Sequence, residues 1–383
     1  MKRPNTGRYA SSIAGGEEVR AFVPAALPPT PALRMTGSVR SMLDQALLAL
    51  GRLDGAAATL PDAHLLLYTY VRKEAVLSSQ IEGTQSTLDD LLKHELGAAP
   101  GVPIEDVAEV SRYVEALDHG LNRLRGGFPL SNRLLREMHS ILLAVGRGAT
   151  KAPGEFRRSQ NWIGGTRPGD AVFVPPPPQE VENCMGRLEQ FLHSDTPPLV
   201  KAALAHVQFE TIHPFLDGNG RIGRLLVTLM LCHDQVLREP LLYSSLYFKQ
   251  HRQQYYTELN AVRKTGDFER WLEFFAVAIR VSAEQAFTTA QRIFAVFQED
   301  RARLKDLGRQ APAALLIQEA LQTKPLATIA ALAKATGLTT PTVTQALREL
   351  DKHQIVRETT GRARGRIYAY SRYLDALNAE PSA

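Results

Sequence analysis

The sequence predicts a mainly α-helical protein with one small β-hairpin near its middle and a winged helix-turn-helix unit at its C-terminal end. Three observations predict this. Apolar residues recur at helical spacing through most of the chain, as they do in residues 132–145. Runs typical of β-strands are confined to residues 162–174 and 355–370. A polar helical segment at 282–310 separates the last unit from everything before it.

Composition limits the class of protein. At 383 residues the chain is long enough for a large core and two or three domains. It has 45 basic and 40 acidic residues, and the net charge of +5 does not by itself indicate a nucleic-acid partner. Cys184 and Cys232 lack the spacing of a metal site or a disulfide framework. Since there is no apolar run of transmembrane length and no apolar signal region, we expect a soluble, cytoplasmic protein without a membrane partner.

The first region, residues 1–103, is expected to hold an arm and two helices. Residues 1–35 are rich in Gly, Pro, Ser and Arg, which predicts an extended arm outside the core. A helix with an alanine and leucine bias follows at residues 38–50. The Gly/Ala/Pro segment 97–103 reads as a linker that ends the region.

The second helix of this region, from Pro61 to Gly83, places a carboxylate on its apolar face. Proline suits a helix start and glycine a helix stop. Because an unpaired charge that faces inward is costly, Glu82 should have a cationic partner. The alternative is that the helix ends before Glu82 and leaves it in water. The inward stripe that Glu82 continues consists of Leu67, Val71, Ala75 and Ser78.

The middle region, residues 104–281, should contain most of the helical core. Ser131 is a plausible N-cap for the second of its helices. Two β-type runs, 162–163 and 171–174, flank a Gly/Pro-rich turn and predict a hairpin. The helices are expected at residues 104–125, 132–145, 181–193 and 199–212.

The segment from His213 to Arg224 concentrates the groups that carry chemistry. His213 stands at the end of an apolar helical segment, which Pro214 prevents from continuing. The run Asp217–Gly220 has the backbone freedom for a tight loop, and a new helix should start near Arg221. Exposed N–H groups at a helix start attract anions, and Arg221 and Arg224 should share one face of its first turn. This combination indicates phosphoryl or nucleotidyl transfer.

The same residues also match the dinucleotide-binding pattern G-x-G-x-x-G. Gly218, Gly220 and Gly223 supply the glycines, and Glu239 lies at a suitable distance for an acid that binds ribose. That interpretation needs a β-strand before the glycines and a surrounding βαβ unit. A helix and a His-Pro break precede them here, so the dinucleotide interpretation is disfavoured.

The segment resembles, at every defined position, the signature H-P-F-x-(D/E)-G-N-G-R-x-x-R of the Fic family, whose members transfer the AMP part of ATP to a protein hydroxyl. The resemblance implies that His213 is the general base and that Asp217 holds Mg²⁺. Related Doc-type kinases have a degraded glycine loop, whereas this sequence keeps it. The resemblance implies contacts to ATP from Gly218, Asn219, Gly220, Arg221, Ile222, Gly223 and Arg224, with the two arginines at the β/γ end.

The residues Ser78, Glu82 and Gly83 fit a second motif of that family, (S/T)-x-x-x-E-(G/N), which is inhibitory. The resemblance implies that Glu82 pairs with Arg224, occupies the place of the γ-phosphate and holds ATP in an unreactive pose. Because the motif precedes the signature in the same chain, the inhibition would be built in.

Other site residues follow from the resemblance with alternatives left open. The hairpin at 162–174 would be the flap that pairs with an extended segment of the target, or it only covers the core. Tyr256 and Leu259 are candidates for the adenine pocket, with an aromatic core as the alternative. Arg263 stands where relatives often have asparagine, which puts the adenine contacts in doubt. His206 and Glu210, four residues apart, have no third metal ligand nearby, so structural or surface roles are favoured.

The last unit, residues 311–383, looks like a winged helix-turn-helix. Three helices are expected, at 315–321, at 329–335 and behind Thr339 or Thr340. Two strands then flank a loop that is rich in arginine, and this charge suits DNA phosphates. The alternative is a protein-docking or dimer module. The arginines on or beside the wing are Arg362, Arg364 and Arg366.

The sequence therefore predicts Mg²⁺-dependent transfer of AMP from ATP to a Ser, Thr or Tyr hydroxyl of a protein, self-modification included, restrained by Glu82. One rival uses the same pocket to hydrolyse AMP from a modified protein, with Glu82 positioning water. A second is a DNA-binding regulator whose core only senses nucleotide. The wing arginines support that regulator, whereas the intact His213 and Asp217 argue against it. The target and a homodimeric state stay open.

Overall fold

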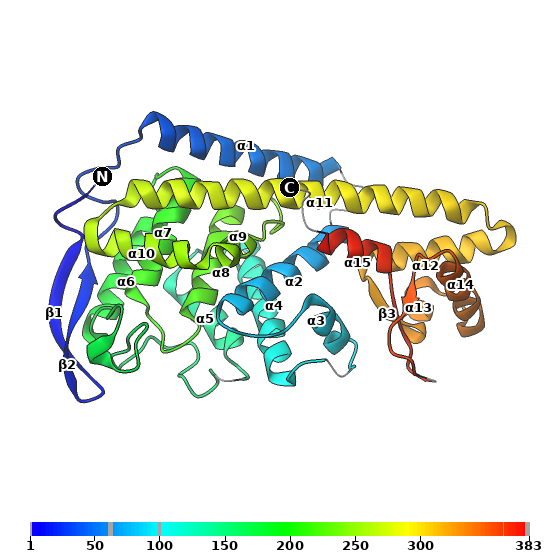
Figure 1. The fold of residues 1–383 in the computed structure, drawn as a ribbon, viewed down its shortest axis with the longest axis horizontal. Helices are drawn as coiled ribbons and strands as arrows, with labels where there is room; N and C mark the ends of the chain where they lie inside the picture. The colour runs from blue at the N-terminus through cyan, green and yellow to red at the C-terminus, as the bar shows by residue number, and fades with distance from the viewer. Residues whose placement is uncertain (1, 60–63, 99–100, 147, 363, 380–383) are drawn as a thin grey trace.

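Helices form most of this computed structural model, which describes residues 2–59, 64–98, 101–146, 148–362 and 364–379 (Figure 1). The helices are α1 (Gly37–Thr59), α2 (His64–Ile81), α3 (Leu88–Glu95), α4 (Ile104–Arg125), α5 (Asn132–Leu142), α6 (Pro178–Leu192), α7 (Pro198–Ile212), α8 (Asn219–His233), α9 (Ser245–Gln250), α10 (Arg252–Thr265), α11 (Phe268–Lys305), α12 (Ala311–Thr323), α13 (Ile329–Thr336), α14 (Thr340–Lys352) and α15 (Ser371–Asn378). The strands are β1 (Gly7–Ala14), β2 (Glu17–Pro24), β3 (Leu326–Thr328), β4 (Arg357–Glu358) and β5 (Ile367–Ala369).

Helix α7 lies at the centre of the core. Every residue from Leu199 to Ile212 is buried, which is the pattern of a helix enclosed on all sides. Helix α8 packs against it, so the loop between α7 and α8 is held by two core helices. Helix α11 runs along the length of the molecule, with α1 beside it (Figure 1).

The predicted N-terminal arm is instead a β-hairpin. Strands β1 and β2 are antiparallel, and the pair Ala14↔Glu17 leaves Gly15 and Gly16 as a two-residue turn. Both glycines have positive φ, +55° and +84°, which such a turn requires. The prediction took the small residues as loop and missed this Gly-Gly signal. The N–H of Phe22 on β2 donates to the Val174 carbonyl at 2.9 Å, which joins the hairpin to the middle of the chain.

Helix α2 ends at Ile81, the residue before Glu82, and Gly83 follows with φ +100°, so the predicted helix stop at Gly83 is correct to within two residues. Helix α3 was not predicted, although Thr87 and Asp90 form a reciprocal capping box at its start. The predicted start at Pro61 lies outside the described residues.

The predicted hairpin at residues 162–174 is reduced to one bridged pair. Ile163 and Phe173 exchange both backbone hydrogen bonds, at 2.8 and 3.1 Å. A 3₁₀ turn at Pro168–Asp170 fills the loop between them. Residues 162–174 therefore form a strand-like flap, and β2 is hydrogen-bonded to it through Phe22 and Val174.

The C-terminal elements follow the order α12, β3, α13, α14, β4 and β5, with a three-stranded antiparallel sheet of order β3-β5-β4. Helix α11 is continuous across the predicted boundary between residues 281 and 282. Helix α15 leaves this unit and returns to α11, beside α2 (Figure 1).

Within the described part of the chain, no helix combines the length and the apolar composition needed to cross a bilayer.

Candidate active site

The backbone holds His213 in an unusual conformation at the end of α7. As the C-cap residue it has φ 50° and ψ 60°, in the left-handed region that non-glycine residues rarely occupy. Arg157 stabilises this turn from outside the signature: its Nε donates to the His213 carbonyl and its backbone N–H donates to the Pro214 carbonyl, both at 2.9 Å. The sequence prediction missed Arg157, because only the fold brings it to this loop.

The imidazole of His213 is neutral over the whole physiological range. Desolvation, followed by the charges of Arg263 and Arg157, lowers the pKa of His213 well below its ordinary value. Its Nδ1 atom has no hydrogen-bond partner among the described residues. A neutral imidazole can accept a proton, which is the state that a general base requires.

The loop after His213 is closed by side chains of the signature. Oδ1 of Asn219 accepts from the Phe215 N–H at 2.8 Å, and Nδ2 donates to the Phe215 carbonyl at 2.9 Å. Outside the signature, His139 accepts from the Gly154 N–H at 2.8 Å, so its other ring nitrogen donates to the Asp217 carbonyl at 3.0 Å. The side chain of Asn219 therefore holds the loop closed. Its backbone N–H, in the first turn of α8, is the Asn219 group that remains for a ligand.

The start of α8 offers backbone donors to an anion. The N–H groups of Asn219, Gly220 and Arg221 lie in the first turn of α8 and therefore have no acceptor within the helix. Ile222 is one layer deeper, because its N–H already donates to the Gly218 carbonyl at 3.0 Å and its side chain is fully buried. Gly223 is also inside: a Cβ there would lie 2.5 Å from Oε1 of Glu210.

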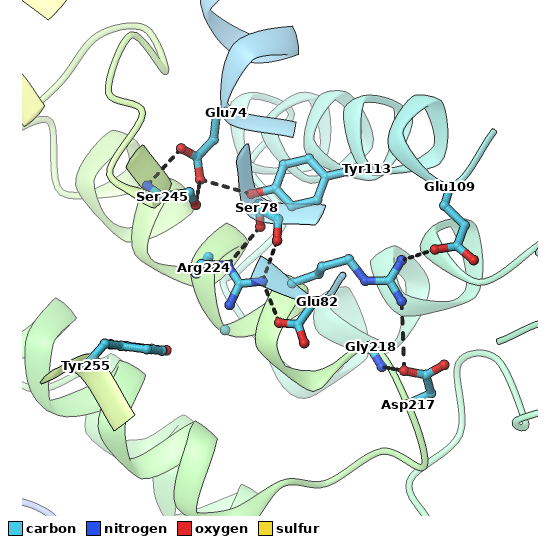
Figure 2. A network of polar contacts seen from close by, with 12 residues as sticks. Glu74, Ser78, Glu82, Glu109, Tyr113, Asp217, Gly218, Arg224, Ser245 and Tyr255 are labelled. Atoms are coloured by element: carbon cyan, nitrogen blue, oxygen red, sulfur yellow. Dashed lines mark hydrogen bonds and ion pairs between the residues drawn. The ribbon is translucent and has the colours of Figure 1, made fainter. Parts of the chain in front are cut away.

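The expected contact between Glu82 and Arg224 is present (Figure 2). Oε1 of Glu82 lies 2.7 Å from Nη2 of Arg224. Ser78 completes the arrangement, since its Oγ accepts from Nε of Arg224 at 2.8 Å and its carbonyl accepts from Nη2 at 3.0 Å. The guanidinium is almost fully buried, whereas the Glu82 side chain is 37% exposed and can be reached from the site.

Glu82 also lies over the start of α8. A Cβ atom on Gly220 would be only 2.2 Å from Oε1 of Glu82, so glycine is needed for this approach. A carboxylate above the first turn of a helix is favoured by the helix dipole and by the free N–H groups. The Glu82 carboxylate thus lies between Arg224 and the start of α8.

The side chains of Arg221 and Arg224 point apart, although they were expected on one face. Nη1 of Arg221 lies 3.5 Å from Glu109 on α4, and its Nη2 lies 3.9 Å from Oδ1 of Asp217. Arg224 points to α2 on the other side. Only Arg224 is therefore directly engaged by the carboxylate of Glu82.

Asp217 retains a partly exposed carboxylate at the mouth of the site. Its Oδ1 accepts from the Gly218 N–H at 2.6 Å, and 41% of the side chain is exposed. The described residues contain no cluster of three or more His, Cys, Asp or Glu that could hold a metal. One carboxylate still fits Mg²⁺, which is commonly bound by one or two carboxylates together with substrate phosphates and water.

Tyr256 borders the site and Tyr255 lies in the core. Tyr256 is half-buried, and burial together with the nearby Glu82 charge raises its pKa. The hydroxyl of Tyr255 lies 2.8 Å from Nε2 of His206, whose Nδ1 contacts the Gly223 carbonyl at 2.9 Å. His206 is thus a buried structural residue, as favoured, and Leu259 is buried as well.

Arg263 has a structural place near the flap. It donates to the Glu210 carbonyl at 2.8 Å and to Oγ1 of Thr211 at 3.2 Å, and its guanidinium lies 4.0 Å from the ring centre of Phe173. The residue that departs from the pattern of relatives therefore ties the end of α7 to the flap.

A buried acid, Glu74, lies one turn before Ser78 on α2. Ser245 donates to it from its N–H at 3.1 Å and from its hydroxyl, and the Tyr113 hydroxyl lies 3.4 Å away (Figure 2). Burial raises the pKa of Glu74 to about 7, although these donors and Arg224 oppose the shift. The carboxyl group that anchors α2 therefore titrates near neutral pH.

The stability of the Glu74→Gln variant relative to the native protein should increase as the pH rises. The raised pKa means that Glu74 favours the folded state below about pH 4.5 and loses this contribution as the pH passes 7. Glutamine does not titrate. The unfolding free energy of the variant minus that of the native protein should therefore increase by up to about 3 kcal/mol between pH 5 and 8. Denaturant unfolding at both pH values measures this, and an unchanged difference would contradict the assignment.

Two family models match the parts of the chain that build this site. Residues 40–122 match the Fic/DOC family N-terminal model, and residues 129–231 match the Fic/DOC family model. Residues 40–122 and 129–231 are Fic/DOC family segments. The first Fic match contains α2 with Glu82, and the second contains the flap, His213 and Arg224.

Comparisons with individual proteins place this chain among related sequences and folds. It is 38% identical over 127 residues to "Protein adenylyltransferase Fic" of Aedes aegypti and of Drosophila grimshawi, which is 32% of this chain and 23% of each relative. The chain thus spans about a quarter of the length of these curated relatives. A Fic family protein from Desulfovibrio desulfuricans G20 has a TM-score of 0.59 at 21% identity, with 89% of this chain and 98% of the other covered. A fragment of Fic-1 from C. elegans has a TM-score of 0.50 at 21% identity, with 66% and 73% covered. These two solved structures support the fold.

Proposed function

We propose that this protein transfers AMP from ATP to a hydroxyl group of a protein. The observation that carries the proposal is the placement of a neutral imidazole, His213, beside a helix start whose anion position is already taken by a carboxylate, Glu82. The curated relatives named protein adenylyltransferase support the same activity. ATP is the substrate that such a site requires.

In this reaction the hydroxyl oxygen of a Ser, Thr or Tyr side chain attacks the α-phosphorus of ATP. The bond between the α-phosphorus and the oxygen that bridges to the β-phosphate breaks, and pyrophosphate leaves. His213 accepts the hydroxyl proton. The N–H groups at the start of α8 and the Arg224 side chain stabilise the negative charge of the phosphates.

Mg²⁺ would be held by Asp217, whose carboxylate is partly exposed at the mouth of the site. A bound Mg²⁺ would neutralise charge on the phosphates. Arg221, which lies between Glu109 and Asp217, would keep this carboxylate in place. Tyr256 remains the candidate for contact with the adenine.

The flap at 162–174 supports a protein as the acceptor. Its exposed apolar side chains, Trp162 and Val172, are 37% and 59% exposed. An extended segment of a target could add to its backbone by strand pairing, which depends little on target sequence.

Purified protein incubated with α-labelled ATP and Mg²⁺ tests the proposal. Label on protein bands, with pyrophosphate released in equal amount, is the expected result. Loss of AMP from a previously modified protein, dependent on Glu82, would instead favour the hydrolytic rival. Neither reaction would favour a nucleotide sensor.

Binding of DNA by the C-terminal unit is a second candidate function. The element order α12, β3, α13, α14, β4 and β5, with a three-stranded antiparallel sheet, supports a winged helix-turn-helix. Arg362, Arg364 and Arg366 are exposed in and beside the loop between β4 and β5, and Arg348 and Gln345 are exposed on α14. These side chains suit a phosphate backbone beside a groove.

Replacing the three loop arginines Arg362, Arg364 and Arg366 with glutamine should weaken DNA binding and flatten its salt dependence. Each lost phosphate contact should lower the log–log slope by roughly one, because fewer counterions are released. Binding titrations at several salt concentrations measure the slope. A matched triple substitution of exposed Arg8, Arg133 and Arg158, far from this unit, is the control. No binding by the intact protein at low salt would favour a docking module.

A further inference from the structure

Helix α2 presents one stripe of residues to the active site. Glu74 and Ser78 lie four apart on α2 and Glu82 is the residue just after its end, and the three side chains bind Ser245 and Arg224 (Figure 2). Residues four apart share a helix face, so this stripe is one continuous contact. Its position sets where the Glu82 carboxylate lies.

A second stripe on α2 binds the C-terminal helix α15. Thr69 Oγ1 lies 2.8 Å from the hydroxyl of Tyr373, and that hydroxyl also donates to the Leu65 carbonyl at 3.1 Å. One turn further on, Nζ of Lys73 donates to the Leu377 carbonyl at 2.7 Å. Leu65, Thr69 and Lys73 are again four apart, so α15 is hydrogen-bonded to one side of α2 over two turns.

The hydroxyl of Tyr373 makes its hydrogen bonds to α2. The side chain is fully buried, and its ring lies 5.1 Å from Phe297 on α11 and 6.0 Å from Tyr370. A buried hydroxyl without a partner is costly, so the two contacts to α2 stabilise the docked arrangement. Helix α12 also contacts α2.

We propose that the C-terminal unit, residues 311–379, holds α2 against the active site through Tyr373, so that loosening this contact releases Glu82 from Arg224. The proposal rests on the proposed function for its effect on AMP transfer, but not for its effect on α2. A helix moves as a rigid element, and a shift at Thr69 is therefore carried to the residue that follows its last turn. Any ligand that binds the C-terminal unit better when α15 is displaced would raise activity.

The test compares Tyr373→Phe with Tyr370→Phe. The Tyr370 hydroxyl binds Asp300 at 2.8 Å and Gln318 at 3.1 Å and does not contact α2, so it is a matched loss of one buried hydroxyl from the same unit. Thr69→Val removes the partner hydroxyl from the α2 side at nearly constant shape. Two quantities are measured: hydrogen exchange of the α2 amides, and AMP transfer from α-labelled ATP.

Tyr373→Phe and Thr69→Val should each raise exchange in α2 by roughly tenfold, and Tyr370→Phe should not. Both should raise transfer several-fold in the native background and have no further effect when Glu82 is already glycine, since the two changes act through the same contact. Unchanged exchange in α2, or an equal effect of Tyr370→Phe, would overturn the proposal. Faster exchange without faster transfer, in a protein that Glu82→Gly does activate, would also overturn it. If Glu82→Gly itself has no effect, the proposed inhibition fails and exchange alone decides whether α15 holds α2.

Discussion

Replacing Glu82 with glycine should raise the rate of AMP transfer, self-modification included, by an order of magnitude or more. The carboxylate now binds Arg224 and lies over Gly220, where a phosphate of ATP would be held. An ordered anion that competes for a guanidinium and a helix start lowers the share of productively bound nucleotide. Transfer from α-labelled ATP, measured side by side for both proteins, gives the ratio.

Two further variants separate charge from flexibility. Glu82→Gln keeps the shape and removes the charge, so it should also be activated. Gln85→Gly, in the same exposed turn, adds backbone freedom without touching Arg224 and should have native activity. The glycine variant should melt at a lower temperature without nucleotide, because Arg224 is buried beside fewer acceptors, and MgATP should restore part of the loss. A change in neither transfer nor melting would remove Glu82 from any inhibitory role.

Replacing His213 with alanine should abolish measurable transfer while sparing nucleotide affinity. Proton removal by a positioned base is typically worth on the order of 10²–10⁴ in rate. The neutral state of this imidazole does not change across the physiological range, since its pKa is held far below neutrality. Single-turnover transfer and nucleotide binding by the same preparation are the two measurements.

The left-handed backbone of His213 calls for a second variant. Alanine adopts φ 50° poorly, so part of any loss could come from a shifted loop. Asparagine tolerates that conformation better and cannot act as a base, and His213→Asn should therefore be equally inactive with a melting temperature closer to the native one. Transfer at a near-native rate by either variant would exclude His213 from the mechanism.

The parts of the site that are close in sequence could be predicted, because local chemistry decides them. Pro214 ends α7 after His213, and the residues Asp217–Gly220 form the turn that starts α8. The contact between Glu82 and Arg224 was also expected from the motif, although it joins the turn after α2 to the distant helix α8. Without the motif, the sequence indicated only that Glu82 should have a cationic partner.

The supporting contacts could not be predicted, because they exist only after the helices have packed. Nothing near Arg157 or Glu109 in the sequence marks them as partners of His213 and Arg221. The opposite directions of Arg221 and Arg224 depend on which helices lie on either side of α8. The capping box before α3 and the Gly-Gly turn between β1 and β2 are local sequence signals that the prediction missed.

Because Phe22 is hydrogen-bonded to Val174, the structural unit around the flap extends beyond residues 129–231, the segment that matches the Fic/DOC family model. A fragment trimmed to residues 129–231 would lose the strand that borders its flap and the ring of Phe22 that packs 6.1 Å from Phe173. Transplanting residues 213–224 into another scaffold would leave behind both the flap and the strand β2 beside it. For protein engineering, the first two dozen residues therefore belong with residues 129–231, and affinity tags are better placed away from them.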